Sequence, residues 1–427
     1  MKIQINNGRV IDPANIIDEA GPVCIEDGVI VSVMRIPKGF KPDQVIDARG
    51  RWVCPGIIDL SARFGEPGDE SKATIASEAA AAASAGVTTV CCPPDTSPVI
   101  DTPAVVELIH QRATKSNKVR IYPIGALTQG LKGERLSEMY ALRQAGCIGV
   151  SNANHPVINN EILRRTFEYA ASTDLIVFIH PEDHHLRNHG VVNEGAISTR
   201  LGLPPIPETA ETVAISTALL LIEQTGVKAH FCRLSTAKGV EMIARAKRVG
   251  LPVSADAGIC HLYLTEQDVD GYNANCHIIP PLRRMEDREG LLQGLLAGTI
   301  DAVCSDHQPH NDDAKTAPFS LTRPGASTLE ALLPLMLDLV DKDLLTPMQV
   351  FEKLAVNPAK ILGLESGSLT AGSIADVIVV DPELSWTLTT SQMLSAGKNT
   401  PFINWELSGK VTHTFLNGQL VYNGTSS

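Results

Sequence analysis

Hydrophobic positions in the central part of the chain form short runs that alternate with longer segments of helical period. Eight such runs predict strands: Gly56–Leu60, Thr88–Cys92, Arg120–Ala126, Cys147–Ser151, Leu175–Ile179, Lys228–Leu234, Pro252–Asp256 and Ile300–Ser305. The clearest helical segments between them, each followed shortly by a glycine that ends a helix, are Thr74–Ala85, Glu208–Gln224 and Thr236–Val249. This alternation predicts an α/β fold, a (β/α)8 TIM barrel over residues 51–364. A doubly wound open sheet is the alternative, but no Gly-x-Gly-x-x-Gly segment follows any strand.

Both ends of the chain predict short β-strands without helices. Alternating polar and apolar residues flank Asn7-Gly8 near the N-terminus and Asn417-Gly418 near the C-terminus. Asn-Gly between alternating strands is a strong hairpin signal, because both central positions of the turn need a positive φ. Ala375–Val380 adds a further strand. We therefore expect residues 1–50 and 365–427 to form one small β-sandwich module, built from both termini.

The net charge and the cysteine pattern limit the kinds of partner and the cellular compartment that we expect for this protein. The formal net charge of −12 is spread along the chain, which argues against nucleic acid or an anionic membrane as the main partner. None of the nine cysteines forms a Cys-x-x-Cys pair, a pattern typical of buried free thiols in a reducing compartment. The chain begins without the apolar core of a signal peptide, and no apolar run approaches the ~20 residues that span a bilayer. These features predict a cytoplasmic protein.

The segments that carry candidate chemistry follow the predicted strands, where barrel enzymes place their functional groups. The first strand runs into Ser61–Gly68, the fifth into His180–Asp183 and the eighth into Ser305–His310. Pro280–Arg283 and Asn357–Lys360 come later in the barrel region. Together and in this order, these segments resemble the bacterial dihydroorotase branch of the cyclic amidohydrolases. The resemblance covers nearly the whole chain, and it also implies a split β module.

This resemblance implies a two-zinc centre that hydrolyses a cyclic amide. In the family, imidazoles and carboxylates hold the metals, a metal-bound water becomes hydroxide, and an aspartate shuttles the proton. The sequence departs from the family at most ligand positions. The His-x-His pair after the first strand is replaced by Ser61 and Arg63, and the bridging carboxylate after the fourth strand by Ala153. The histidine after the sixth strand is replaced by Arg233.

His180 and Asp306 alone keep the residues that the family has at its metal centre. A catalytic zinc normally has three protein ligands, so one imidazole and one carboxylate cannot hold two zinc ions. Arginine offers no lone pair, and its permanent charge repels a cation. We therefore expect no bound metal, and we expect Asp306 to pair with Arg63 or Arg233. His180 is either a lone zinc ligand or a hydrogen-bonded core residue, and the ligand count favours the second interpretation.

The positions that contact substrate in the family have changed in parallel. The family arginine that pairs with the substrate carboxylate is replaced by Gly65, and two family asparagines by Asp95 and Ile279. The positions that still match the family are His310, Pro324 and Gly325. Asp95 would repel the substrate carboxylate. We therefore interpret the matching substrate positions, and the aspartate after the eighth strand, as vestigial.

A second histidine cluster follows the fifth strand. His184, His185 and His189 lie close in sequence to Glu182 and Asp183. A relocated metal site is one interpretation of this run. A solvated loop is favoured, because neighbouring residues rarely supply convergent ligand geometry.

Three functions remain open. The favoured one is a non-catalytic dihydroorotase homologue that acts as an assembly subunit; the resemblance implies the catalytic chain of aspartate carbamoyltransferase as its partner, in a hetero-oligomer of pyrimidine biosynthesis. The second is an active cyclic amidohydrolase that interconverts carbamoyl aspartate and dihydroorotate at a remodelled zinc site. The third is a module that binds a small anion through Arg63 and Arg233 at the barrel mouth.

Overall fold

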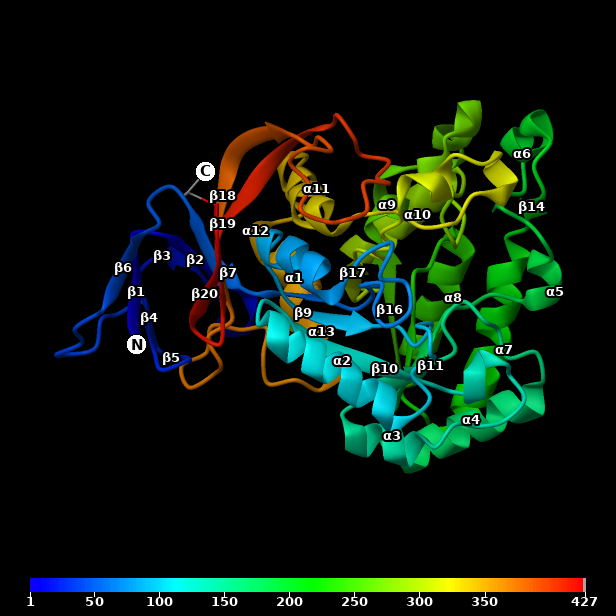
Figure 1. The fold of residues 1–427 in the computed structure, drawn as a ribbon, viewed down its shortest axis with the longest axis horizontal. Coiled ribbons are helices and arrows are strands. Elements are labelled where there is room, and N and C mark those ends of the chain that lie inside the picture. Colours follow the sequence, from blue (N-terminus) through cyan, green and yellow to red (C-terminus); the bar gives the residue numbers. More distant parts are fainter. Residues whose placement is uncertain (425–427) are drawn as a thin grey trace.

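A parallel barrel forms the centre of the computed structural model, which describes residues 1–424 (Figure 1). Its strands, in hydrogen-bonded order, are β8 (Ile57–Asp59), β9 (Val87–Cys92), β10 (Arg120–Ala126), β11 (Gly149–Ser151), β12 (Ile176–Ile179), β15 (Ala229–Phe231), β16 (Val253–Gly258) and β17 (Ala302–Cys304). Each overlaps one of the eight predicted strands. An isolated bridge between Ala62 and His307 joins the ends of β8 and β17, so the barrel is nearly closed. The predicted barrel is confirmed, and the doubly wound sheet is excluded.

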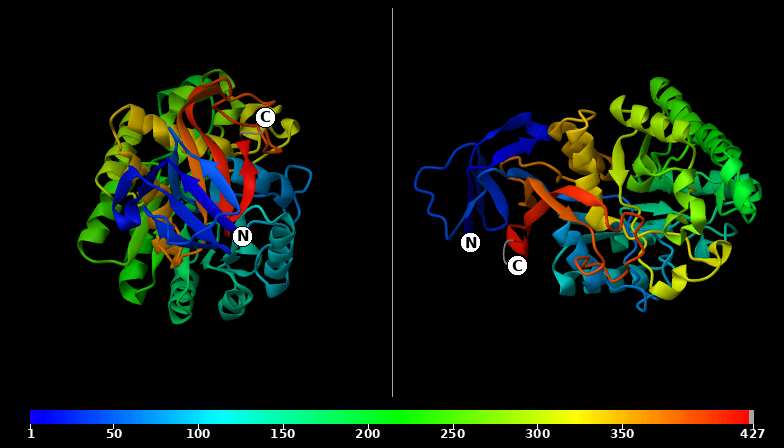
Figure 2. Two further views of the ribbon diagram at one scale, coloured as in Figure 1. Left: turned by 90° about the vertical axis from the view of Figure 1, so that its left-hand side faces the viewer. Right: turned by 90° about the horizontal axis from the view of Figure 1, so that it is seen from above.

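Helices surround the barrel (Figures 1 and 2). The longer ones are α1 (Ile75–Ser84), α2 (Pro103–Ser116), α3 (Met139–Ala145), α4 (Asn160–Ser172), α7 (Thr209–Thr225), α8 (Ala237–Arg248), α10 (Met285–Leu296) and α11 (Leu329–Asp341). The shorter ones are α5 (His184–Arg187), α6 (Ala196–Leu201), α9 (Ile259–Tyr263), α12 (Pro347–Phe351) and α13 (Asn357–Leu362). Local sequence determines several ends: Thr74 caps α1, Thr236 caps α8, and Gly226 ends α7 in the left-handed conformation.

The module at one end of the molecule consists of two sheets, and it contains the first strand and the last described strand of the chain (Figures 1 and 2). The first sheet has the order β5 (Val29–Val33), β4 (Val23–Glu26), β1 (Lys2–Asn6) and β6 (Gln44–Asp47). The second has the order β20 (Gln419–Asn423), β19 (Glu406–Leu416), β18 (Val377–Thr387), β7 (Trp52–Pro55), β2 (Arg9–Asp12) and β3 (Ile17–Ala20). A separate hydrophobic core, which includes Ile3, Ile25, Val53 and Phe415, is shared by the two sheets. The predicted β-sandwich from both termini is therefore present.

The two Asn-Gly segments adopt different structures. Asn417 and Gly418 have φ values of 50° and 70° and connect the antiparallel strands β19 and β20, as predicted. The predicted hairpin at Asn7-Gly8 is wrong, because β1 pairs with β4 and β6 whereas β2 pairs with β3 and β7 in the other sheet. A Cβ atom on Gly8 would lie 2.6 Å from Cγ2 of Val53. This glycine therefore permits close packing between the sheets.

Two further predictions concern membrane spans and thiols. No helix within residues 1–424 is both long and apolar enough to cross a bilayer. All nine cysteines are free thiols. Eight of them are buried, and Cys232 is half-buried. The predicted buried thiols are thus present with this one exception, which follows the last residue of β15.

Candidate functional site at the barrel mouth

The loops that follow the barrel strands bring the predicted site residues together. Ser61, Arg63, Ala153, His180 and Arg233 all line one cavity at the C-terminal ends of the strands. Its volume is about 20 Å3, and a cavity of this size holds about one water molecule. We call this group of side chains, together with Asp306 and Asp95, the barrel mouth.

Three positions in the barrel mouth have an uncommon backbone conformation. The φ angles of Ala153, Arg233 and Asp306 are 48°, 54° and 49°. This left-handed region is sparsely populated by residues other than glycine, and each such residue costs on the order of 1–3 kcal/mol. Local hydrogen bonds hold two of them: Ser151 Oγ accepts from the Ala153 amide at 2.9 Å, and Asp256 accepts from the Arg233 amide. The surrounding structure therefore determines the direction in which these side chains point.

Asp306 is held by the two arginines that the family resemblance places at metal-ligand positions. Its Oδ1 atom lies 2.6 Å from Nη1 of Arg233 and 3.5 Å from Nη1 of Arg63. Ser61 Oγ donates to the same oxygen at 3.4 Å, and Arg233 Nη2 donates to Asn154 Oδ1 at 2.9 Å. Burial acts to lower the pKa of Arg233, but the Asp306 carboxylate outweighs it, so the pKa is raised. The pairing that we expected for Asp306 is present, and it involves both arginines.

Arg63 has a second and closer partner in Asp95. Its Nε atom lies 3.1 and 3.0 Å from the two carboxylate oxygens of Asp95, and its Nη2 lies 2.9 Å from Oδ2. Burial would raise the pKa of Asp95, but the Arg63 guanidinium outweighs it and holds this pKa below its usual value. From the sequence alone, we interpreted Asp95 only as a group that repels the substrate carboxylate. The sequence did contain a signal for this ion pair. Where the resemblance implies an asparagine and a histidine, this chain has a carboxylate, Asp95, and a cation, Arg63.

His180 is buried but lacks the hydrogen bonds that we expected. Its side chain is 2% exposed, and neither ring nitrogen has a hydrogen-bond partner among residues 1–424. Nε2 lies 3.8 Å from Oε2 of Glu182, which is too long for a hydrogen bond. Burial lowers the pKa of His180, although Glu182 opposes this effect, so the imidazole is neutral at neutral pH. A buried polar group without a partner costs about 1–3 kcal/mol.

These residues do not fit a two-zinc centre. Arg233 and Arg63 bring two guanidinium groups to the aspartate that the family resemblance assigns to the metal centre. Among residues 1–424, His180 is the one histidine that lines the 20 Å3 cavity. Because a zinc site needs three or four ligand atoms, the donors at the barrel mouth are too few and the permanent cations are wrongly placed.

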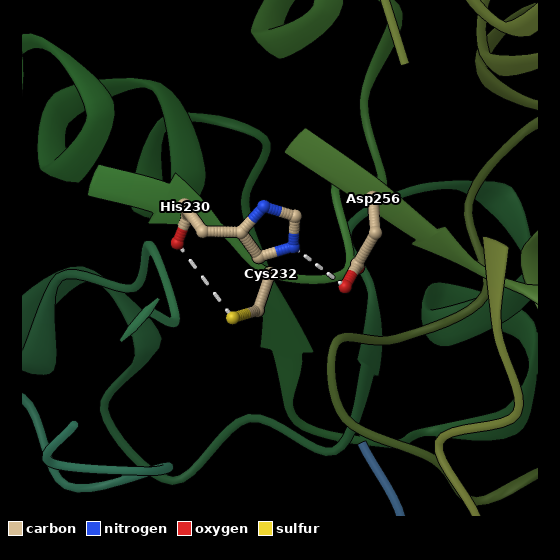
Figure 3. Close-up of side chains that lie close together, drawn as sticks. All are labelled: His230, Cys232 and Asp256. Atoms are coloured by element: carbon tan, nitrogen blue, oxygen red, sulfur yellow. Dashed lines mark hydrogen bonds and ion pairs between the residues drawn. The ribbon is translucent and has the colours of Figure 1, made fainter. Parts of the chain in front are cut away.

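One group of side chains below the barrel mouth has the spacing of metal ligands (Figure 3). Within the described part of the chain, ligand atoms of His230, Cys232 and Asp256 lie within 4.8 Å of one another. The ring of His230 is already bonded through Nδ1 to Ser254 Oγ at 2.8 Å and through Nε2 to Asp256 Oδ2 at 2.9 Å. Burial raises the pKa of Cys232 well above the usual thiol range, which disfavours the thiolate that binds metals. The cluster is therefore a satisfied hydrogen-bonded network.

The histidine run after β12 is exposed. His184, His185 and His189 face solvent, and the first two belong to the single-turn helix α5. Asp183 caps this helix by accepting from the amides of His185 and Leu186 at 3.0 and 2.8 Å. None of these histidines belongs to a group with metal-ligand spacing among the residues searched. The predicted solvated segment is present as a short helix.

The remaining predicted substrate residues contact one another. The His310 Nε2 atom lies 2.9 Å from the carbonyl oxygen of Pro324. Gly325 has a φ of 120°, and a Cβ atom there would lie 2.6 Å from Cβ of Gln308. Burial lowers the pKa of His310 to about 4, so this imidazole is neutral. The three matching positions thus form a packed loop beside the barrel mouth.

Comparisons with known proteins agree with this architecture. Residues 50–239 match a family model described as dihydro-orotase-like. A "Dihydroorotase-like protein" of Pseudomonas aeruginosa (strain PAO1) is 45% identical over 424 residues, which cover 99% of this chain and 100% of that protein. A "Dihydroorotase" of Geobacter sp. (strain M21) is 40% identical over 425 residues, 99% of each chain. The solved L-hydantoinase (dihydropyrimidinase) from Arthrobacter aurescens has a TM-score of 0.89 at 24% identity, with 99% and 96% of the two chains covered, and shows the same fold.

Proposed function

This chain belongs to the dihydroorotase-like family of the amidohydrolase superfamily, and from that premise we propose that it is a non-catalytic member that acts as a structural subunit. The observation that carries the proposal is the ion-pair network of the barrel mouth. Arg233 and Arg63 both bind Asp306, the residue to which the resemblance assigns proton transfer. Both guanidinium groups donate to Oδ1 of Asp306, so this oxygen is already engaged by hydrogen bonds.

Space at the barrel mouth supports the same proposal. Hydrolysis of a cyclic amide needs room for the ring and for an attacking water, together with a group that accepts a proton. The cavity at the former ligand positions has a volume of about 20 Å3, which is about one water molecule. Three donors, from Ser61, Arg63 and Arg233, already share Asp306 Oδ1.

The proposed partner is the catalytic chain of aspartate carbamoyltransferase, in a hetero-oligomer. This part follows from the family resemblance: dihydroorotases of this branch are similar to proteins that assemble with that enzyme, which precedes them in pyrimidine biosynthesis. A copy that keeps the fold and loses the site would be retained for assembly. We propose a cytoplasmic location, because nine free thiols stay reduced there.

The test is an assay of the purified chain with zinc supplied. We expect no interconversion of carbamoyl aspartate and dihydroorotate above a zinc-only blank, and no stoichiometric zinc in the same sample. The Geobacter relative named dihydroorotase, assayed in parallel, is the matched control. Turnover together with bound zinc would overturn the proposal. Size-exclusion chromatography with the organism's own aspartate carbamoyltransferase then tests assembly, and separate elution of the two chains would contradict the partner.

A second candidate function is an active zinc-dependent cyclic amidohydrolase with a relocated metal. The observation that favours it is the group formed by His230, Cys232 and Asp256. Zinc there would have to displace the contact between His230 and Asp256 and deprotonate the Cys232 thiol. Stoichiometric zinc that disappears in C232S would favour this candidate. Binding of a small anion is not proposed, because Arg63 and Arg233 already have carboxylate partners.

A further inference from the structure

Helix α7 has an outer face without charge. Its sequence contains no charged residue from Thr212 to Ile222. Val213 and Leu220 in this stretch are 41% and 68% exposed, Ser216 is exposed, and Thr217 is half-buried. Because residues three, four and seven positions apart share one face of a helix, these four side chains form a stripe, which we call the α7 face.

Other strongly apolar helices of the barrel are covered. A helix that is apolar around most of its circumference is normally buried. α1 and α11 follow this rule, because strand β19 of the β-sandwich module packs against both of them. α7 lies on the side of the molecule away from that module (Figure 1), and its outer face is exposed in the single chain. The α7 face therefore has the composition of a contact surface.

An open cavity of about 280 Å3, the outer cavity, lies beside the α7 face. Val213 and Thr217 of α7 line it on one side, and Leu163 of α4 and the exposed Ile158 line it on another. His180 lines both the outer cavity and the 20 Å3 cavity of the barrel mouth. Because the outer cavity is open at the surface next to exposed apolar residues, it suits a side chain of a docking protein.

The spacing along the α7 face is self-complementary. Val213 and Leu220 lie at equal distances in sequence from the midpoint between Ser216 and Thr217. In a two-fold antiparallel pair of α7 helices that crosses at this midpoint, Val213 of each copy faces Leu220 of the other. The small side chains at the crossing let the two helices approach closely. Leu220 of each copy then reaches the outer cavity beside Val213 of the other.

The distribution of charge also fits a second copy of this chain. Because each copy has a net charge of −12, two copies repel each other least where their surfaces carry no charge. In the antiparallel pair, the exposed Glu223 of one copy lies opposite Ala210 of the other, in the first turn of α7, where the helix dipole attracts a carboxylate. The Ala210 carbonyl oxygen accepts from the amide of Asp183, which precedes the exposed His184 and His185. The helix ends are thus complementary in charge.

We propose that this chain forms a symmetric dimer through the α7 face, in which Leu220 of each copy docks into the outer cavity beside Val213 of the other. The residues that carry this inference lie outside the barrel mouth. It therefore goes beyond the proposed function and does not depend on whether the chain is catalytic.

Sedimentation velocity on the full chain tests the surface. The wild type should form a dimer with a Kd of about 10 µM or tighter. Leu220→Glu should raise this Kd at least ~10-fold, because it places a carboxylate in an apolar contact. Ile36→Glu is the matched control: Ile36 is 51% exposed in the β-sandwich module, and the same change there should alter the Kd by less than ~2-fold. Thermal unfolding of both variants shows whether they have folded.

Disulfide trapping tests the register independently of Leu220→Glu. An oxidised mixture of V213C and L220C should give a covalent heterodimer. Each variant alone should give far less, because two copies of the same position lie about 10 Å apart along the helix pair, beyond the reach of a disulfide. A wild-type chain that stays monomeric at ~100 µM would overturn the inference. So would a dimer with equal Kd in L220E and I36E, or cross-linking of V213C alone as fast as in the mixture.

Discussion

The barrel mouth and the strands that lead into it bury carboxylates in different ways. At the mouth, Asp306 and Asp95 are bound by guanidinium groups at 2.6 and 2.9 Å. In the strands, Asp59 accepts hydrogen bonds from neutral donors: the backbone amides of Ser61 and Ser305 and the hydroxyl of Ser305. Asp256 is bound by the imidazole of His230 and the backbone amide of Arg233. The mouth thus depends on permanent charge, whereas the strands depend on polar groups without a permanent charge.

Because of this difference, substitution and a change of pH should affect the stability of the two regions differently. A guanidinium stays charged at all accessible pH values, so removal of an arginine is the way to disturb the mouth. Burial raises the pKa of Asp59 to about 6 in spite of its hydrogen bonds. Asp59 therefore titrates above the range of Asp95 at the mouth, whose pKa is held below its usual value by Arg63. Substitution and pH test the two regions separately.

The largest expected loss of unfolding free energy is the one caused by Arg233→Ala. The Arg233 side chain is 4% exposed, so its loss leaves Asp306 buried with only the weaker contacts to Arg63 and Ser61. Breaking a buried pair from one side costs about 3–5 kcal/mol of unfolding free energy. Urea unfolding followed by circular dichroism measures it. The double variant R233A/D306A should recover much of the loss, and wild-type stability in R233A would contradict the role of the pair.

The next effect is the pH dependence contributed by Asp59. The folded-state pKa of about 6 lies above the ordinary value of 3.8, so between about pH 4 and pH 6 the folded protein binds more protons than the unfolded chain. This group therefore lowers stability as pH rises through that window, by about 3 kcal/mol for about two pH units. Asp59→Asn should remove this slope. Urea unfolding at several pH values checks it, and parallel curves for D59N and wild type would contradict it.

Arg63→Ala should lower the free energy of unfolding by less than Arg233→Ala does. The side chains of Arg63 and Asp95 are 18% and 19% exposed, so water screens the pair and solvates the carboxylate that remains. We expect a loss of about 1 kcal/mol, reduced further in high salt. Parallel urea titrations of R63A and R233A measure the difference. Equal losses would mean that the mouth is one cooperative network.

The smallest expected effect is that of zinc on thermal unfolding. A ligand that binds the folded state raises the unfolding temperature, and the residues at the barrel mouth do not form a ligand set. We expect excess zinc or a chelator to move the midpoint by less than about 1 °C. A clear rise with zinc, accompanied by stoichiometric binding, would show ligands outside the mouth, with His230 and Cys232 as the first to substitute.

Much of the fold was predictable because barrel strands and helices leave local periodic patterns. All eight strands were located, although the sixth was predicted as Lys228–Leu234 and the structure shortens it to Ala229–Phe231. It ends early because Arg233 turns into the left-handed conformation. The N-terminal hairpin was predicted wrongly because Asn7-Gly8 lies where the chain crosses from one sheet to the other, and a turn signal does not say which strands pair.

The order of the barrel elements and the two-ended module could be read from the sequence alone, and the family resemblance implied that Ser61, Arg63 and Arg233 stand at metal-ligand positions. Those properties depend on residue type and on spacing within one element. The folded structure was needed to show that Asp95 is the closest partner of Arg63 and that both arginines meet at Asp306. It also decided that His180 lies in the wall between two cavities. These contacts join residues far apart in the chain, and barrel closure, which brings distant strand ends together, creates them.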